Sequence, residues 1–181
     1  DDNGALVWNE LRKVLRDLRP DMVGISAMTV FAASARRISR IVKQELPQAW
    51  VVWGGPHPTS CDREVLEGDS VDFCARREGE ETMLDLVGAL EAGKRGDFSG
   101  LLGLSWRNAE GRCVRNPERP LVKNLDAMPH PDKDNVILPA YYDPSHFNNT
   151  FTARGCPFKC NFCAQDKVWS RVVRYRSLPS I

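Results

Sequence analysis

The sequence predicts an α/β fold built on a doubly wound parallel sheet. Apolar residues recur at helical spacing in several segments of the first half of the chain. Short apolar runs, "MVGISAM", "WVVWGG" and "VDFCA", separate these segments and are typical of buried strands. Helices and strands that alternate in this way form a parallel sheet with helices on both faces.

The expected elements follow one another from residue 1 to about residue 97. We expect helices at residues 4–18, 31–46, 63–66 and 80–93, and strands at residues 21–28, 49–55 and 71–75. The first of these helices carries an apolar face made of Val7, Leu11, Val14, Leu15 and Leu18. A doubly wound sheet normally opens on a strand. We therefore expect its first strand to lie upstream of residue 1 and the chain to be a fragment.

A segment of different texture, residues 98–147, follows the alternating part. Residues 100–116 contain two strand-like runs around a turn at Asn108–Gly111, which predicts a hairpin. Residues 120–147 are rich in proline and aspartate and lack periodicity, so we expect a structured linker. A strand expected at residues 150–153 then leads into a cysteine-rich loop.

The composition is that of an ordinary globular protein. The chain has 181 residues, 42% of them hydrophobic and 27% charged, with a net charge of +1. This charge gives no reason to expect nucleic acid as a partner. No apolar run approaches the roughly 20 residues of a membrane span, and the first residues do not resemble a signal peptide. We therefore expect a cytoplasmic protein, in which a tight cysteine cluster is a metal site rather than a disulfide framework.

The cysteine cluster is Cys156, Cys160 and Cys163, in the spacing CxxxCxxC. Zinc sites normally present four ligands as two separated pairs, and this loop presents three thiols. Three thiolates on one short loop suit a 4Fe-4S cluster whose fourth iron stays open to another ligand. Zinc with His146 as the fourth ligand is the alternative. Cys61, Cys74 and Cys113 stand far apart and look like single core or surface residues.

Polar and glycine residues stand at the carboxyl ends of the expected strands, where such sheets bind ligands. They are Ser26, Met28 and Thr29 at the end of the first strand, Gly54, Gly55, Pro56 and His57 at the end of the second, and Glu78, Gly79 and Glu80 following the third. The glycine pair allows a flat or bulky group to approach the backbone, because no Cβ stands in the way. The alternative is a tight strand-to-helix turn in which Ser26 is a cap and His57 is a loop histidine.

The loop "ARGCPFKCNFC" resembles the signature of the radical SAM superfamily, with the aromatic residue Phe162 just before the last cysteine. The resemblance implies that the three cysteines hold a 4Fe-4S cluster and that S-adenosylmethionine (SAM) binds the open iron, with Phe162 beside it. It also implies reductive cleavage of SAM to a 5′-deoxyadenosyl radical. The cofactors carry that chemistry, while the protein ligates, orients and excludes water.

The upstream half resembles the cobalamin-binding domain of cobalamin-dependent radical SAM enzymes. The matching segments are "PDMVGISAMT", "VVWGGPHPTS", "VDFCARREGEET" and "NLDAMPHPD", and "VVRYRS" resembles the segment that follows the cluster loop. The resemblance implies a Rossmann-like cobalamin-binding domain at residues 1–97, a linker with a hairpin at 98–147, and the truncated start of a radical SAM β/α barrel at 148–181. The ten strand-end residues named above would then contact cobalamin.

Two features depart from the family's pattern. The family usually has glycine where this chain has Arg77, so the loop that follows could sit differently. The chain also lacks a DxHxxG motif, which would supply a histidine to the lower face of cobalt. No general acid or base can be named, and we expect the chain by itself to be inactive.

Several functions remain open. C-methylation of an unactivated carbon is the main hypothesis. A ring-forming enzyme of the tetrapyrrole cyclase type and a radical SAM enzyme that binds no cobalamin are alternatives, as are a cobalamin-binding sensor and a zinc-stabilised interaction module. The expected partners are a small-molecule substrate and an electron donor such as flavodoxin or ferredoxin. Six basic residues could face that donor or form a solvated surface: Arg154, Lys159, Lys167, Arg171, Arg174 and Arg176.

Overall fold

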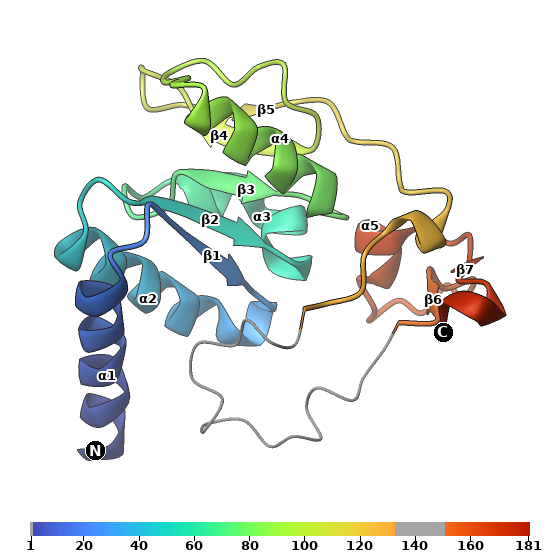
Figure 1. Ribbon diagram of the computed structural model, residues 1–181, viewed down its shortest axis with the longest axis horizontal. Coiled ribbons are helices and arrows are strands. Elements are labelled where there is room, and N and C mark those ends of the chain that lie inside the picture. Colours follow the sequence, from blue (N-terminus) through green and yellow to red (C-terminus); the bar gives the residue numbers. More distant parts are fainter. Residues whose placement is uncertain (1, 133–150) are drawn as a thin grey trace. The chain divides into compact units, whose positions relative to one another are not determined.

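The structure is a computed structural model that describes residues 2–132 and 151–181 (Figure 1). The chain forms two compact units, Asp1–Pro120 and Leu121–Ile181. The expected fourth zinc ligand, His146, lies outside the described residues, as does most of the second half of the expected linker. None of the described helices is long and apolar enough to cross a membrane.

The first unit contains one mixed sheet, with strand order β1-β2-β3-β4-β5. Strands β1, β2 and β3 are parallel, and β4 and β5 continue the sheet in antiparallel fashion. The elements in chain order are α1 (Asp2–Leu18), β1 (Met22–Ser26), the 3₁₀ turn η1 (Thr29–Phe31), α2 (Ala32–Glu45), β2 (Trp50–Gly54), α3 (Pro56–Leu66), β3 (Phe73–Ala75), α4 (Glu80–Glu91), β4 (Leu104–Arg107) and β5 (Cys113–Arg115). The predicted alternation of helices and parallel strands is confirmed.

Helices cover both faces of the sheet, as the pattern predicts. Because side chains alternate along a strand, β2 directs Val51 and Trp53 to one face and Val52 to the other. The first face packs against α1, α2 and α3, and the second against α4. Trp53 is fully buried, and its indole N–H donates to Ser39 Oγ at 2.8 Å, so the one polar atom of this side chain is satisfied.

The hairpin expected in the linker belongs to the sheet of the first unit. Phe98 packs edge-on against Phe73 and Trp106, with ring centroids 4.9 and 5.6 Å apart. On the other face the buried carboxylate of Asp62 accepts hydrogen bonds from Ser105 Oγ at 2.5 Å and Arg115 Nη1 at 2.9 Å. Aromatic packing on one side, and on the other the contact between the buried Asp62 and the exposed Arg115, hold β4 and β5 beside β3.

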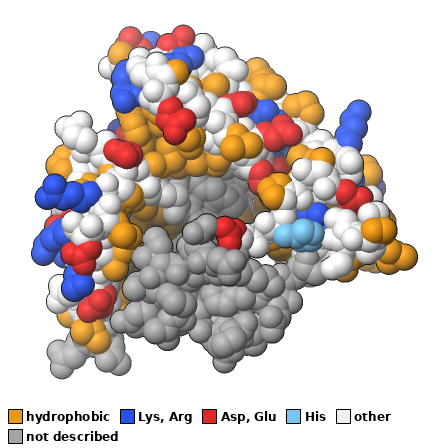
Figure 2. All heavy atoms as spheres, in the orientation of Figure 1, with side chains coloured by type: hydrophobic (Ala, Val, Ile, Leu, Met, Phe, Trp, Pro, Cys, Tyr) orange, Lys and Arg blue, Asp and Glu red, His pale blue; other side chains and the backbone are white. Residues whose placement is uncertain are grey.

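The apolar face predicted for helix α1 is confirmed at Leu11 and Leu15 and is wrong at Val7 and Leu18. Val7 and Leu18 are exposed, whereas Trp8, Leu11 and Leu15 pack against the core. The Arg37 guanidinium lies over the Trp8 ring, 4.3 Å from its centroid. This contact turns α1 so that its tryptophan, not Val7, faces α2. Charged side chains of both signs cover the outward side of α1 (Figure 2).

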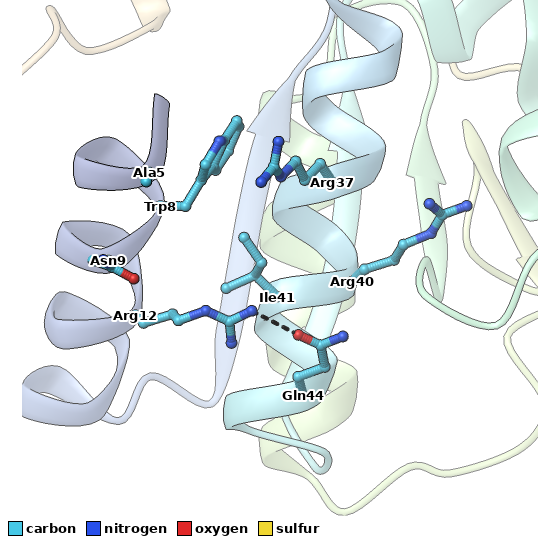
Figure 3. A pocket seen from close by; sticks show the side chains of 8 residues that line it. All are labelled: Ala5, Trp8, Asn9, Arg12, Arg37, Arg40, Ile41 and Gln44. Atoms are coloured by element: carbon cyan, nitrogen blue, oxygen red, sulfur yellow. Dashed lines mark hydrogen bonds between the residues drawn. The ribbon is translucent and has the colours of Figure 1, made fainter. Parts of the chain in front are cut away.

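A pocket of about 340 Å³ lies between α1 and α2 (Figure 3). Figure 3 shows Arg37 turned toward Trp8 and Arg12 reaching across to Gln44, with a hydrogen bond of 2.9 Å. The pocket is therefore bordered by contacts between α1 and α2.

The second unit is small. It contains the 3₁₀ turn η2 (Leu125–Ala127), β6 (Ala153–Arg154), α5 (Gln165–Trp169), β7 (Arg174–Tyr175) and the 3₁₀ turn η5 (Leu178–Ser180). Strands β6 and β7 form an antiparallel pair, with Ala153 opposite Tyr175. The strand expected at residues 150–153 begins at Ala153, and residue 150 lies outside the described residues.

The ionic link between α1 and α2 predicts a pH dependence of stability. Hydrogen bonds from Arg16 and Arg12 lower the pKa of Glu45 from 4.5 to about 2. A depressed folded-state pKa contributes stability above about pH 4.5, which is lost as the pH falls toward about 2. We expect Glu45→Gln to be less stable than the wild type at pH 7, with a difference that shrinks on acidification.

Urea unfolding of both proteins between pH 2 and pH 7 measures this difference. The charge-neutral control is Gln48→Ala, an exposed residue close to the same helix end. A Glu45→Gln difference that stays constant down to pH 2 would show that the ion pairs do not stabilise the fold.

Candidate functional site

The first candidate site is the set of loops at the carboxyl ends of β1, β2 and β3. These ends lie at one edge of the sheet because the three strands are parallel. Two backbone hydrogen bonds join the first two loops: Ala27 N–H donates to the Gly54 carbonyl at 2.8 Å, and His57 N–H donates to the Ala27 carbonyl at 3.0 Å. Ala27 is fully buried between them. The β1 and β2 loops therefore form one rigid piece.

The two glycines after β2 have different roles. Gly55 has φ +93°, and a Cβ on it would lie 3.1 Å from both the Ala27 carbonyl oxygen and Ser26 Oγ. The fold therefore requires glycine at this position. A Cβ on Gly54 would meet only the Ala75 carbonyl oxygen, at 3.8 Å, which is ordinary contact. The packing of the fold therefore does not require glycine at residue 54. A ligand that approaches the backbone closely at this point would require it.

His57 is part of helix α3 and is buried, with 4% of its surface exposed. The helix expected at residues 63–66 begins earlier, because Pro56 starts it directly after Gly55, and the alternative that His57 is a loop histidine is wrong. His57 Nδ1 lies 3.3 Å from Thr29 Oγ1. The imidazole thus supports the β1 loop through its contact with Thr29. Ser26 does not cap α3, whose N-cap residue is Gly55.

The β1 loop presents an apolar surface that the sequence pattern only partly indicated. Met28 and Thr29 are exposed, and so are Val30 and Phe31, with 80% and 55% of their surface accessible. Large apolar side chains this exposed often mark a binding surface. Val30 and Phe31 were not among the predicted site residues. The apolar run "VFAA" after the strand is the signal that could have indicated them.

The β3 loop contains a strained residue. Arg77 has φ +63°, a left-handed conformation that glycine adopts without strain. This geometry explains why glycine is usual at that position in the family that the sequence resembles. Arg77 Nη1 pairs with Glu118 Oε2 at 2.6 Å and lowers the pKa of that carboxyl group. Arginine at this position thus adds an ion pair to the loop.

The other predicted residues of the β3 loop are not equally accessible. Glu78 is buried, with 6% of its surface exposed, whereas Glu80 in the first turn of α4 is exposed. Gly79 is the N-cap of α4, and a Cβ on it would have ordinary contacts only. Of the three, Gly79 and Glu80 are the ones placed for direct contact with a ligand.

A buried arginine anchors the start of this loop. Arg76 is 1% exposed, its Nη2 donates to the Asn116 carbonyl, and its Nε lies 3.9 Å from the Asp62 carboxylate. Burial lowers the pKa of Arg76 and raises the pKa of the neighbouring Cys74 thiol. A thiol held protonated in this way is a poor metal ligand. Cys74 is accordingly a core residue, as its isolation in the sequence suggests.

One pocket of the first unit lies away from these loops. The pocket of about 730 Å³ lies at the amino ends of β1 and β2 beside α4, where Met22, Trp50 and Arg95 line it. The strand-end loops carry the exposed apolar side chains of Met28, Val30 and Phe31, which offer a contact surface to an apolar ligand.

The second candidate site is the loop that carries Cys156, Cys160 and Cys163. It starts at Gly155, which has φ +106°, and a Cβ there would lie 2.1 Å from the Val172 carbonyl oxygen. Cys156 N–H donates to the Ser170 carbonyl at 3.2 Å, which ties the loop to the segment before β7. Glycine is thus obligatory where the chain turns into the loop.

The three thiols are free, and those of Cys160 and Cys163 are exposed. Across residues 2–132 and 151–181, no group of three or more His, Cys, Asp or Glu side chains is arranged to hold a metal ion. The structure therefore places the three cysteines on one loop without gathering their sulfurs. Metal–thiolate sites commonly close only when the metal binds. Phe162, between the last two cysteines, has 89% of its surface exposed and is free to contact a ligand.

Comparison with known proteins confirms the resemblance. Residues 4–87 match the family model of the B12 binding domain. The chain is 34% identical to an uncharacterized methyltransferase of Pyrococcus horikoshii over 97% of its own length and 38% of the relative's. It is 34% identical to the anaerobic magnesium-protoporphyrin IX monomethyl ester cyclase of Rubrivivax gelatinosus, over 89% of the chain and 30% of that protein. The chain thus spans only 30% to 38% of the length of these relatives.

Solved structures give the same result. The cobalamin-dependent S-adenosylmethionine radical enzyme OxsB, with aqua-cobalamin and S-adenosylmethionine bound, superposes with a TM-score of 0.71 at 26% identity. The match covers 96% of the chain and 24% of that structure. The radical S-adenosylmethionine methyltransferase TsrM of Kitasatospora setae shares the fold, with a TM-score of 0.74 at 18% identity over 96% of the chain and 35% of that structure.

The two glycines after β2 give a prediction on stability. We expect Gly55→Ala to lower the free energy of unfolding by at least about 2 kcal/mol, because the new Cβ is strained at positive φ and crowds the β1 loop. Gly54→Ala should change it by no more than about 0.5 kcal/mol, because no neighbour is displaced. Chemical unfolding of both variants provides the comparison, and equal stabilities would contradict the assigned roles.

Proposed function

We propose that this chain is the cobalamin-binding part, with the cluster loop, of a cobalamin-dependent radical SAM enzyme. The observation that carries the proposal is that the B12 binding domain match ends within α4 and so includes all three strand-end loops. The sequence and the geometry indicate the same edge of the sheet as the binding surface.

The strand-end loops fit cobalamin. Gly54 leaves the backbone open to a flat macrocycle, and the apolar side chains of Met28, Val30 and Phe31 offer it a hydrophobic contact. The exposed Ser26 and Thr29 can hydrogen-bond polar groups at its edge, as can Glu80 on the opposite loop. The other predicted residues lie behind this surface and support it: Gly55, Pro56, His57 and Glu78. Bound cobalamin supplies a cobalt centre that can carry a methyl group.

The cysteine loop fits a 4Fe-4S cluster in the chemistry of its donors. Cys156, Cys160 and Cys163 would ligate three irons, leaving one for SAM, with Phe162 beside it. A cluster held there supplies the electron that cleaves SAM. The protein's own part is to hold the loop, through Gly155 and the Cys156–Ser170 hydrogen bond. The exposed cations Lys159 and Arg171 suit an acidic electron donor such as flavodoxin.

C-methylation of an unactivated carbon in a small molecule is the function that we favour. The Pyrococcus relative and TsrM are both described as methyltransferases. Tetrapyrrole ring formation is the second candidate, because the cyclase of Rubrivivax gelatinosus is as similar in sequence as the methyltransferase of Pyrococcus. Both functions use the same two cofactors on this chain.

Corrinoid binding tests the first half of the proposal. We expect the purified chain to bind hydroxocobalamin with a shift of its visible bands, and Gly54→Val to raise the dissociation constant about tenfold or more, because the larger side chain occupies the macrocycle's place. The control is Gly88→Ala on α4, a glycine whose Cβ would meet nothing. Wild-type binding that Gly54→Val leaves unchanged would refute this site.

Anaerobic reconstitution with iron and sulfide tests the second half. We expect about four irons per chain and a brown chromophore, lost in Cys160→Ala and retained in Cys113→Ala. A chain that takes up zinc instead, with no chromophore, would support the zinc-stabilised interaction module and contradict the cluster.

A further inference from the structure

We propose that Thr59 is a positioning residue that sets the β3 loop against the β2 loop and thereby the shape of the corrinoid surface. The inference rests on the proposed function, which assigns cobalamin to these loops. Thr59 lies in the first turn of α3 and is buried, with 6% of its surface exposed. Its hydroxyl group makes a hydrogen bond to each of the two loops.

The two hydrogen bonds use the hydroxyl in opposite senses. Thr59 Oγ1 donates to the Gly55 carbonyl at 2.8 Å and accepts from Arg77 N–H at 2.9 Å. A hydroxyl has one hydrogen to donate and two lone pairs, so one small side chain can serve both backbones. No apolar side chain of the same shape can do this.

Each of the two hydrogen-bond partners of Thr59 is a residue that determines the conformation of its loop. Gly55 is the residue at which the β2 loop touches Ser26 and Ala27 of the β1 loop. Arg77 is the left-handed residue that turns the chain from β3 toward α4. Thr59 therefore connects the paired β1 and β2 loops to the β3 loop through two bonds of ordinary length.

The position of residues 78–80 follows from this link. The segment starts at Arg77, whose amide is held by Thr59 and whose guanidinium is held by Glu118. Glycine would adopt the left-handed conformation without help, whereas arginine is held in it by its partners. The need for a hydroxyl at residue 59 is thus greater here than in a chain with glycine at residue 77.

Three variants separate this role from general stability. Thr59→Val keeps the shape and removes the hydroxyl, while Thr59→Ser keeps the hydroxyl. The matched control is Ser39→Ala, which removes another buried hydroxyl that donates to the Ala35 carbonyl and accepts from the Trp53 indole, both at ordinary distances. Ser39 lies on α2, outside the strand-end loops.

Hydroxocobalamin titration and amide hydrogen exchange are the two measurements. We expect Thr59→Val to raise the dissociation constant about tenfold, with faster exchange at residues 77–79 in the unliganded chain. Thr59→Ser should stay within about threefold of the wild type, as should Ser39→Ala even though it lowers the melting temperature by a similar amount.

The outcomes are distinguishable. If the wild type binds hydroxocobalamin and Thr59→Val binds equally well, the positioning role is overturned and the proposed function stands. Equal weakening by Thr59→Val and Ser39→Ala would also overturn it, because the effect would then follow stability. If the wild type does not bind, the proposed function falls and this inference with it.

Discussion

The close approach of the β1 and β2 loops is the constraint on which the candidate site depends. Ala27 is fully buried between Gly54 and His57 and hydrogen-bonds to both through its backbone. This arrangement exists only because Gly55 has no side chain and adopts φ +93°. Helix α3 starts directly after this turn. Its first turn contains two buried residues: His57, which contacts Thr29, and Thr59, which contacts Arg77. The backbone conformation of Gly55 thus fixes the three loops relative to one another. Between them Gly54, which has no side chain, leaves the backbone accessible to a ligand.

The antiparallel hairpin of β4 and β5, next to β3 in the sheet, also supports the strand-end loops. Asp62 and Arg76 bring charges into the interior between α3 and the β3–β5 strands, where an unpaired charge is costly, and the exposed Arg115 pairs with Asp62. Their mutual arrangement holds the start of the β3 loop, and Glu118, just beyond the hairpin, holds Arg77. The hairpin is therefore a support for the predicted binding loops as well as an extension of the sheet.

Periodicity predicted the parallel strands and three of the helices because each buries a regular apolar face. It did not predict that α3 begins at Pro56, since prolines and glycines there indicate a loop until Gly55 is seen to adopt a positive φ. It placed Val7 rather than Trp8 in the interface, because a cation–π contact with Arg37 is not visible in spacing. The strand-end residues were predictable as a set, but the buried Glu78 and the exposed Val30 and Phe31 depend on loop geometry. For the cysteines, the spacing predicts a set of metal ligands and could not indicate that their sulfurs are not gathered.

The central claim is that cobalamin binds where β1, β2 and β3 end, and a crystal structure of the chain with hydroxocobalamin tests it most directly. The account predicts the corrin ring over Gly54, in contact with the loop from Ser26 to Phe31 and with the loop that starts at Arg77. A corrin ring at the opposite end of the sheet, in the pocket beside Met22 and Trp50, would contradict it.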